Sequence, residues 1–229
     1  MESRAQSHAS RIWGNPTRPY SQAEVIADGV VHIVGLATAV ALGSLTLAFA
    51  ILRTAPGEAP ALAVYLGTLV AVLSVSLAYN VSPISPLKQW LARFDQAAIF
   101  LFIAGTYTPF LALLGGSTAA LALGCFVWGG AIVGIALKLI VPERFGRLAI
   151  PLYLAIGWSG VAVFQSLGAA LPPATLWLLL AGGVVYSAGI IFHLWERLKF
   201  QNVLWHVFVV AGGVLHLVAI LDCMVLSRL

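Results

Sequence analysis

The chain has 229 residues, of which 61% are hydrophobic and 9% charged, and its mean hydropathy is +0.99. Soluble domains are roughly half apolar and a quarter charged, so this composition excludes an ordinary soluble domain and predicts a membrane protein. The net charge of +4 comes from lysines and arginines scattered between apolar runs. Because they form no clustered basic face, we expect no nucleic-acid partner.

The N-terminal segment differs from the rest of the chain. Residues 1–20 are polar, carry arginines and lack an apolar stretch before a small-residue cleavage site. We therefore expect a short polar tail over 1–20 instead of a cleavable signal peptide, followed by one membrane domain over 21–229. Cys125 and Cys223 lie far apart in apolar segments, which predicts neither a disulfide nor a thiolate metal site.

Seven apolar runs follow the tail. A spanning helix needs about 20 mostly apolar residues, because its backbone amides must be satisfied within the segment. The runs cover residues 29–52, 61–79, 95–114, 117–139, 148–167, 175–195 and 203–226. The sequence therefore predicts an all-α fold, a seven-transmembrane helix bundle.

The basic residues between these runs predict the orientation. Ten of the twelve lysines and arginines fall in the N-terminal tail or near the second, fourth and sixth connections, and only Arg53 and Arg228 fall on the other side. Cytoplasmic loops carry the excess of basic residues in multi-pass proteins. We expect the N-terminus in the cytoplasm and the C-terminus outside.

Polar side chains recur at one level of the predicted bundle, in its cytoplasmic third. They are Glu24, Asp28, His32, Tyr79, Asn80, Asp95, Gln96, His193, Asn202 and His206. Ionisable groups inside a membrane are rare and mark functional sites by default. Because five spans contribute to this level, we expect a polar pocket that faces the cytoplasm.

Several of these residues also have a purely structural interpretation. Asp95 begins the predicted third span, where it would be an N-cap for the orphan amides of that helix. Glu24 and Asp28 fit solvated acids that complement a helix dipole, an interpretation we favour for Glu24. His32 fits a neutral imidazole bonded to a neighbouring helix.

Four segments of the chain resemble one family. They are "EVIADGVVHIVG" in the first helix, "SLAYN" at the end of the second, "RFDQAAIFLFIAGTYTPF" in the third and "NVLWHVFVVAGGVLH" in the seventh. With seven spans and a cytoplasmic N-terminus, the chain resembles the bacterial hemolysin III proteins, which belong with the progestin and adipoQ receptor family. The resemblance implies a multi-pass protein of the bacterial inner membrane.

The resemblance also implies a zinc site. In the family, an S-x3-H motif on the second helix and an H-x3-H motif on the seventh supply three histidines, and an aspartate of the third helix lies near the metal-bound water. Three protein ligands leave a fourth position for a water that zinc acidifies. In this chain the aspartate is Asp95 and the retained histidine is His206.

The other family positions depart from this pattern. At the S-x3-H motif this chain has Ser76 and Asn80, so asparagine replaces the histidine. At the H-x3-H motif it has Asn202 and His206, so asparagine replaces the first histidine. Gln96 stands where the family usually has a histidine after the aspartate. An amide oxygen is a weak zinc donor, so we expect either no cofactor or a weakened zinc site. The amides of Asn80, Asn202 and Gln96 are instead expected to bond to one another and to His206 and Asp95, which keeps the pocket polar without an ion.

Two functions fit these observations. The first is a non-enzymatic membrane protein with a degenerate metal site, for which the resemblance implies a cytolysin-like or membrane-homeostasis role and membrane lipids as partners; the ligand stays open. The second is a zinc-dependent hydrolase of lipid amide or ester bonds, with Asp95 as base and Ser76 polarising the carbonyl. A haem held by His32 and His206 has no supporting spacing, and a proton-coupled transporter has no supporting repeat.

Overall fold

The computed structural model describes residues 20–229, apart from the side chains of Glu143, Arg144, Gly146 and Arg147. Except for Tyr20, the predicted polar tail lies outside the described residues. The elements are α2 Gln22–Arg53, α3 Glu58–Val81, α4 Pro86–Leu113, α5 Thr118–Ile140, α6 Pro142–Gly157, η1 Ser159–Val163, α7 Phe164–Ala170, α8 Pro173–Leu194, α9 Gln201–Met224 and η2 Leu226–Arg228. Within 20–229 there is no strand, and seven helical stretches are long and apolar enough to cross a membrane, which confirms the predicted all-α bundle.

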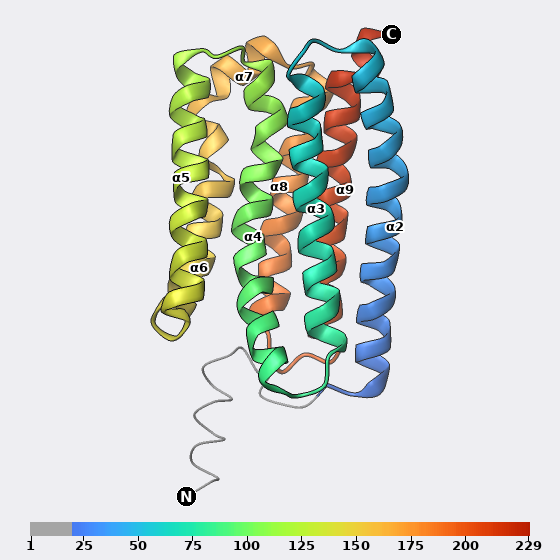
Figure 1. Ribbon diagram of the computed structural model, residues 1–229, viewed down its shortest axis with the longest axis vertical. Coiled ribbons are helices and arrows are strands. Elements are labelled where there is room, and N and C mark those ends of the chain that lie inside the picture. Colours follow the sequence, from blue (N-terminus) through green and yellow to red (C-terminus); the bar gives the residue numbers. More distant parts are fainter. Residues whose placement is uncertain (1–19) are drawn as a thin grey trace, which may run out of the picture.

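The helices run side by side along the long axis of the molecule (Figure 1). Helix α2 packs on α3 and α9, α3 packs on α4, α4 on α5, and α8 on α9, while α5 and α6 stand together at one side. Because the chain alternates direction, α2, α4 and α9 begin at the end of the bundle where α3 and α8 finish. Side chains from several helix termini can therefore meet at this end.

The middle of the bundle is filled by large apolar side chains. Tyr65, Leu69, Phe102, Leu217 and Ile220 are at most 5% exposed and join α3, α4 and α9 in one cluster. A second cluster joins α4, α5 and α6 around Phe100, which is fully buried. Many large apolar side chains point outward from the bundle, as expected for helices whose surroundings are lipid.

The fifth span departs from the prediction of one continuous helix over 148–167. Helix α6 ends at Gly157, a 3-10 segment covers Ser159–Val163, and α7 follows. The hydroxyl of Tyr107 in α4 donates to the Gly157 carbonyl at 2.6 Å and accepts from the Gly160 amide at 3.0 Å. A helix break inside a membrane protein needs such partners because the freed backbone groups meet no water there.

Candidate polar and metal site

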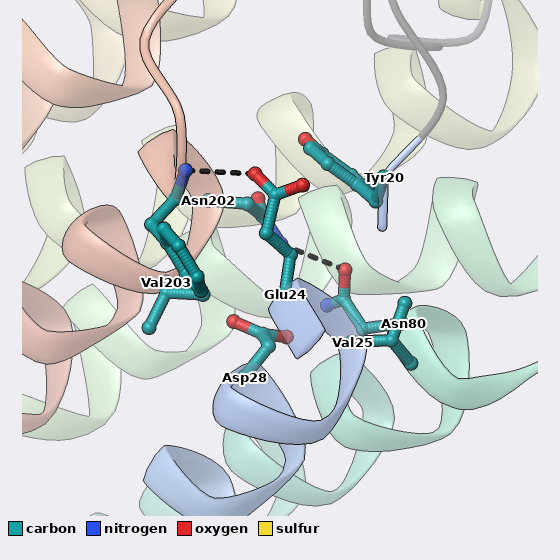
Figure 2. A pocket seen from close by; sticks show the side chains of 8 residues that line it. Tyr20, Glu24, Val25, Asp28, Asn80, Asn202 and Val203 are labelled. Carbon is teal, nitrogen blue, oxygen red and sulfur yellow. Dashed lines mark hydrogen bonds between the residues drawn. The ribbon is translucent and has the colours of Figure 1, made fainter. Parts of the chain in front are cut away.

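The first residues of α2 form one side of the site. Ser21 caps this helix, and its amide and hydroxyl both donate to Glu24 Oε2 at 2.9 Å, so that the two residues form a capping box. Glu24 Oε1 accepts from the Phe200 amide at 2.7 Å, which joins α2 to the start of α9 (Figure 2). Glu24 is only 3% exposed, so the expectation of a solvated acid was wrong.

One turn deeper, α2 presents Asp28 and His32 on the same face, because residues four apart are neighbours on a helix. They are 2% and 1% exposed, so the solvated interpretation of Asp28 was also wrong. His32 Nδ1 is 2.8 Å from the Asp28 backbone carbonyl. Since a carbonyl only accepts, Nδ1 carries the proton and Nε2 keeps its lone pair. Among the described residues, His32 therefore bonds to its own helix and not to a neighbouring one.

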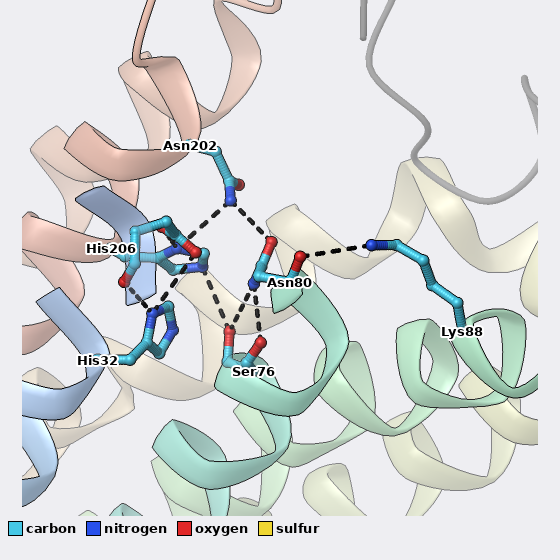
Figure 3. A network of polar contacts seen from close by, with 7 residues as sticks. His32, Ser76, Asn80, Lys88, Asn202 and His206 are labelled. Atoms are coloured by element: carbon cyan, nitrogen blue, oxygen red, sulfur yellow. Dashed lines mark hydrogen bonds and ion pairs between the residues drawn. The ribbon is translucent and has the colours of Figure 1, made fainter. Parts of the chain in front are cut away.

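Helix α9 brings His206 against both residues. His206 Nδ1 lies 2.6 Å from Asp28 Oδ1, and its ring meets that of His32 edge to face at a centroid distance of 4.4 Å (Figure 3). Because a carboxylate oxygen accepts, Nδ1–H of His206 is the donor. The Asn202 amide nitrogen is also 3.5 Å from this Nδ1, but both atoms are donors and do not bond to each other.

The two asparagines at the family's ligand positions bond to each other. Asn202 Nδ2 donates to Asn80 Oδ1 at 2.9 Å, and Asn80 Nδ2 donates to the Ser76 carbonyl at 2.9 Å (Figure 3). The Ser76 hydroxyl lies 3.4 Å from His206 Nε2. Of the predicted amide network, the bond between Asn80 and Asn202 is present and joins α3 to α9.

Asp95 lies in the interior of α4, not at its beginning. The helix begins at Pro86 with Ser85 as its N-cap, whose side chain accepts from the Lys88 amide at 3.2 Å. The N-cap interpretation of Asp95 was therefore wrong. Asp95 is half-buried and lies near Ser76, His206 and Asp28.

Two predicted pocket residues turn away from the amide pair. Gln96 Oε1 accepts from Lys138 Nζ of α5 at 2.5 Å, so Gln96 does not join the predicted amide network. The ring of Tyr79 lies 5.1 Å below the Lys88 ammonium. His193, which was expected at the same level, is exposed, and its ring lies against that of Trp205 at a centroid distance of 4.9 Å.

A small hollow opens beside these groups. It is lined by Tyr20, Glu24, Val25, Asp28, Asn80, Phe200, Asn202 and Val203 (Figure 2). The space for water centres amounts to about 10 Å³, which is roughly one water molecule. Four of the predicted pocket residues, Glu24, Asp28, Asn80 and Asn202, thus share one polar hollow.

Sequence reasoning missed two residues that shape the site. Lys88 Nζ donates to the Ser82 carbonyl at 2.7 Å and reaches the Asn80 carbonyl at 3.5 Å, which satisfies the exposed end of α3. A lysine shortly after a helix C-terminus is a known signal for this role. Phe200, at φ 60°, turns the chain into α9; a non-glycine residue in this region carries no sequence signal.

Comparison with known proteins identifies the family. The sequence model described as "Haemolysin-III related" matches residues 22–217. The chain belongs to the haemolysin-III-related family. It is 31% identical over 191 residues to the "Hemolysin-3 homolog" of Bacillus subtilis, covering 83% of this chain and 89% of that protein.

Two further relatives match over shorter stretches. The "Hemolysin-3" of Bacillus cereus is 40% identical over 119 residues, which is 52% of this chain and 54% of that protein. The human "Monocyte to macrophage differentiation factor" is 28% identical over 127 residues, covering 55% and 52%. With the seven apolar stretches, the family match establishes a multi-pass membrane protein.

The family's three-histidine zinc pattern does not fit the residues present. Of its ligand positions, Asn80 and Asn202 carry amides, and the Asn80 oxygen already accepts from Asn202. Only His206 offers a strong donor there, which is too few for a stable zinc site. A different group, Asp28, His32 and His206, places three possible ligand atoms within 4.8 Å of one another.

Proposed function

We propose that this haemolysin-III-related protein is a non-enzymatic resident of the bacterial inner membrane, with its polar hollow on the cytoplasmic side. The observation that carries the proposal is the direct hydrogen bond between Asn202 and Asn80, 2.9 Å long. A hydrolase of the expected type needs a metal-activated water at these positions. Here the two side chains satisfy each other instead.

The size of the hollow supports the same conclusion. Its room for about one water molecule is far below the 300 to 1,000 Å³ typical of clefts that enclose a small-molecule ligand. Glu24 closes one side of it by holding the Phe200 amide. Ser76 and Asp95, which the hydrolase hypothesis makes catalytic, do not line this hollow.

Between the two non-enzymatic roles, membrane homeostasis fits better than lysis. A pore needs a water-filled conduit lined by polar groups or a controlled apolar constriction. At mid-depth the described helices are instead packed around Tyr65, Leu69 and Phe102, all at most 5% exposed. We propose membrane lipids as the surroundings and partners through which the protein acts.

The orientation rests on the basic residues. Lys88, Arg197 and Lys199 lie at or near the connections at the end of the bundle that carries the polar site, and basic loops stay in the cytoplasm. We expect a C-terminal alkaline phosphatase fusion to be active and a C-terminal green fluorescent protein fusion to be dark. The reverse pattern would refute the cytoplasmic placement of the site.

The enzymatic question is tested in lipid nanodiscs. Purified protein, with and without added Zn²⁺, is incubated with a ceramide and with a fluorogenic lipid ester, and products are measured by mass spectrometry. We expect no product beyond that of protein-free nanodiscs. Zinc-dependent turnover that falls in Asp95→Asn and Ser76→Ala would overturn the proposal.

One observation favours the second candidate, a metal-dependent lipid hydrolase. The Ser76 hydroxyl lies 3.4 Å from His206 Nε2, and Asp95 lies near both residues. The Asn80→His/Asn202→His double variant restores the family's ligands. Hydrolysis by this variant and not by the wild type would show that the fold can support catalysis and that the wild type lacks only the zinc ligands.

A further inference from the structure

The groups on the α2 side of the site suggest a metal position that the family pattern does not contain. Asp28 and His32 come from α2 and His206 comes from α9, and their possible ligand atoms all lie within 4.8 Å of one another. All three side chains are at least 93% buried. Buried ionisable groups in a membrane protein need compensation by a partner or an ion.

Asp28 is only half satisfied. Its Oδ1 accepts from His206 at 2.6 Å, whereas its buried Oδ2 has no hydrogen-bond partner among the described residues. The approach of Oδ2 to His32 Nδ1, at 3.5 Å, is longer than a good hydrogen bond, and Nδ1 already donates to the backbone carbonyl. A buried carboxylate oxygen without a partner is costly and is free to bind a cation.

His32 has the arrangement of a metal ligand. Histidines that bind metals usually donate their other ring N–H to a carbonyl or carboxylate, which fixes the tautomer and the ring orientation. The Asp28 carbonyl accepts from His32 Nδ1 at 2.8 Å, so the free lone pair is on Nε2. The His206 ring lies against it, with the centroids 4.4 Å apart.

We propose that Asp28, His32 and His206 bind one divalent transition-metal ion of the zinc type, in a site built from α2 and α9. Two imidazoles and a carboxylate suit zinc or its neighbours in the first transition row, and they are a poor set for Mg²⁺ or Ca²⁺, which prefer oxygen ligands. Three protein ligands leave a tetrahedral ion one open position.

The charge balance favours the same ion. Glu24, Asp28 and Asp95 bring three carboxylates to this level. Glu24 accepts from the Ser21 and Phe200 amides, whereas Lys88 directs its ammonium to the carbonyls of Ser82 and Asn80. Because the Asn80 and Asn202 amides are neutral, a divalent cation beside Asp28 offsets the charges of Asp28 and Asp95. The site requires no enzymatic activity, so it stands apart from the proposed function.

The test measures metal binding on the full chain, purified in detergent through a tag without histidines. Wild-type protein stripped with a chelator is titrated with Zn²⁺ by calorimetry and with Co²⁺ by visible absorption, which reports tetrahedral coordination. We expect one ion per chain. A wild type that binds neither ion overturns the proposal, whatever the variants do.

Matched variants locate the ion. Even outer-shell substitutions weaken metal sites by 10 to 100 fold, so Asp28→Asn, His32→Gln and His206→Gln should each raise the dissociation constant at least about tenfold. His193→Gln, a substitution of an exposed histidine, should leave it unchanged. Thermal unfolding and gel filtration confirm that each variant is folded.

The asparagines separate this site from the family position. Asn202→Ala should keep the cobalt spectrum, because its amide is no ligand in the proposed site. Binding that survives Asp28→Asn and His32→Gln but is lost in Asn202→Ala would place the ion at the family position and overturn the proposal. Turnover of lipids in nanodiscs would refute the non-enzymatic function but would leave the proposed metal site unaffected.

Discussion

The tyrosine that bridges the break in the fifth span gives the sharpest stability prediction. The Tyr107 hydroxyl makes two firm hydrogen bonds, donating to the Gly157 carbonyl at 2.6 Å and accepting from the Gly160 amide at 3.0 Å. The Ser159 hydroxyl, 3.4 Å away, is better placed to donate to the Ile156 carbonyl at 2.7 Å. Tyr107→Phe therefore removes two bonds and leaves two backbone groups unsatisfied.

The expected loss follows from these two bonds. Hydrogen bonds inside membrane proteins average about 0.6 kcal/mol and reach about 1.7 kcal/mol, so two of them contribute about 1 to 3 kcal/mol. We expect Tyr107→Phe to lower the free energy of unfolding by this amount. The measurement is reversible unfolding in mixed micelles with a denaturing detergent, followed by tryptophan fluorescence.

Tyr186 supplies the matched control. Its buried hydroxyl has no hydrogen-bond partner among the described residues, so Tyr186→Phe removes the same atom at no loss of bonding. We expect it to be neutral or slightly stabilising, because an unpaired buried hydroxyl is unfavourable. Equal effects of Tyr107→Phe and Tyr186→Phe would refute the claim that Tyr107 holds the break.

Two further predictions concern close packing and the entry to α2. A Cβ on Gly134 would lie 2.5 to 2.6 Å from ring atoms of the fully buried Phe100. Gly134→Ala should therefore lower the free energy of unfolding by about 1 to 3 kcal/mol. Gly129→Ala is the control: a Cβ there meets nothing within 4 Å, so the substitution should be neutral or stabilising in the same unfolding assay. Glu24→Gln should lower the free energy of unfolding by about 1 kcal/mol, because it weakens a charge-assisted bond to the Phe200 amide; an unchanged melting temperature would show that this link does not stabilise the bundle.

The number and approximate position of the spans could be predicted from hydropathy alone, but the helix ends could not. An apolar run marks the part of a helix that lies in hydrocarbon. Helix α4 begins at Pro86, nine residues before the predicted start at Asp95. Ser85 followed by Pro86 is a sequence signal for a helix N-terminus. Because these residues end the run "NVSPISP", which is typical of a turn, the signal was read as part of the turn.

The break in the fifth span lies beyond any local sequence signal. Gly157 and Gly160 permit a bend, but glycine is frequent in membrane helices that stay continuous. What stabilises the break is a hydroxyl from α4, Tyr107, about 50 residues earlier. Such a partner is known only once the helices have been packed.

The depth of the site residues in the membrane could be predicted, but the direction in which each side chain points around its helix axis could not. Span positions placed Asp28, Asn80, Asn202 and His206 at one level, and the structure brings these four together. Gln96 shares that level but follows Asp95 by one residue, a rotation of about 100°, and so faces Lys138 of α5.

The loss of two imidazoles has an electrostatic consequence that connects the two halves of the site. In the family's pattern, an ion held by three neutral histidines brings two positive charges to this level, beside the aspartate that corresponds to Asp95. Asn80 and Asn202 bring none, and the carboxylate of Asp28 is buried beside them. His206 then becomes the one described imidazole bonded to that carboxylate at 2.6 Å. Under the proposal above, a cation beside Asp28 Oδ2 would compensate the buried carboxylate oxygen that has no hydrogen-bond partner among the described residues.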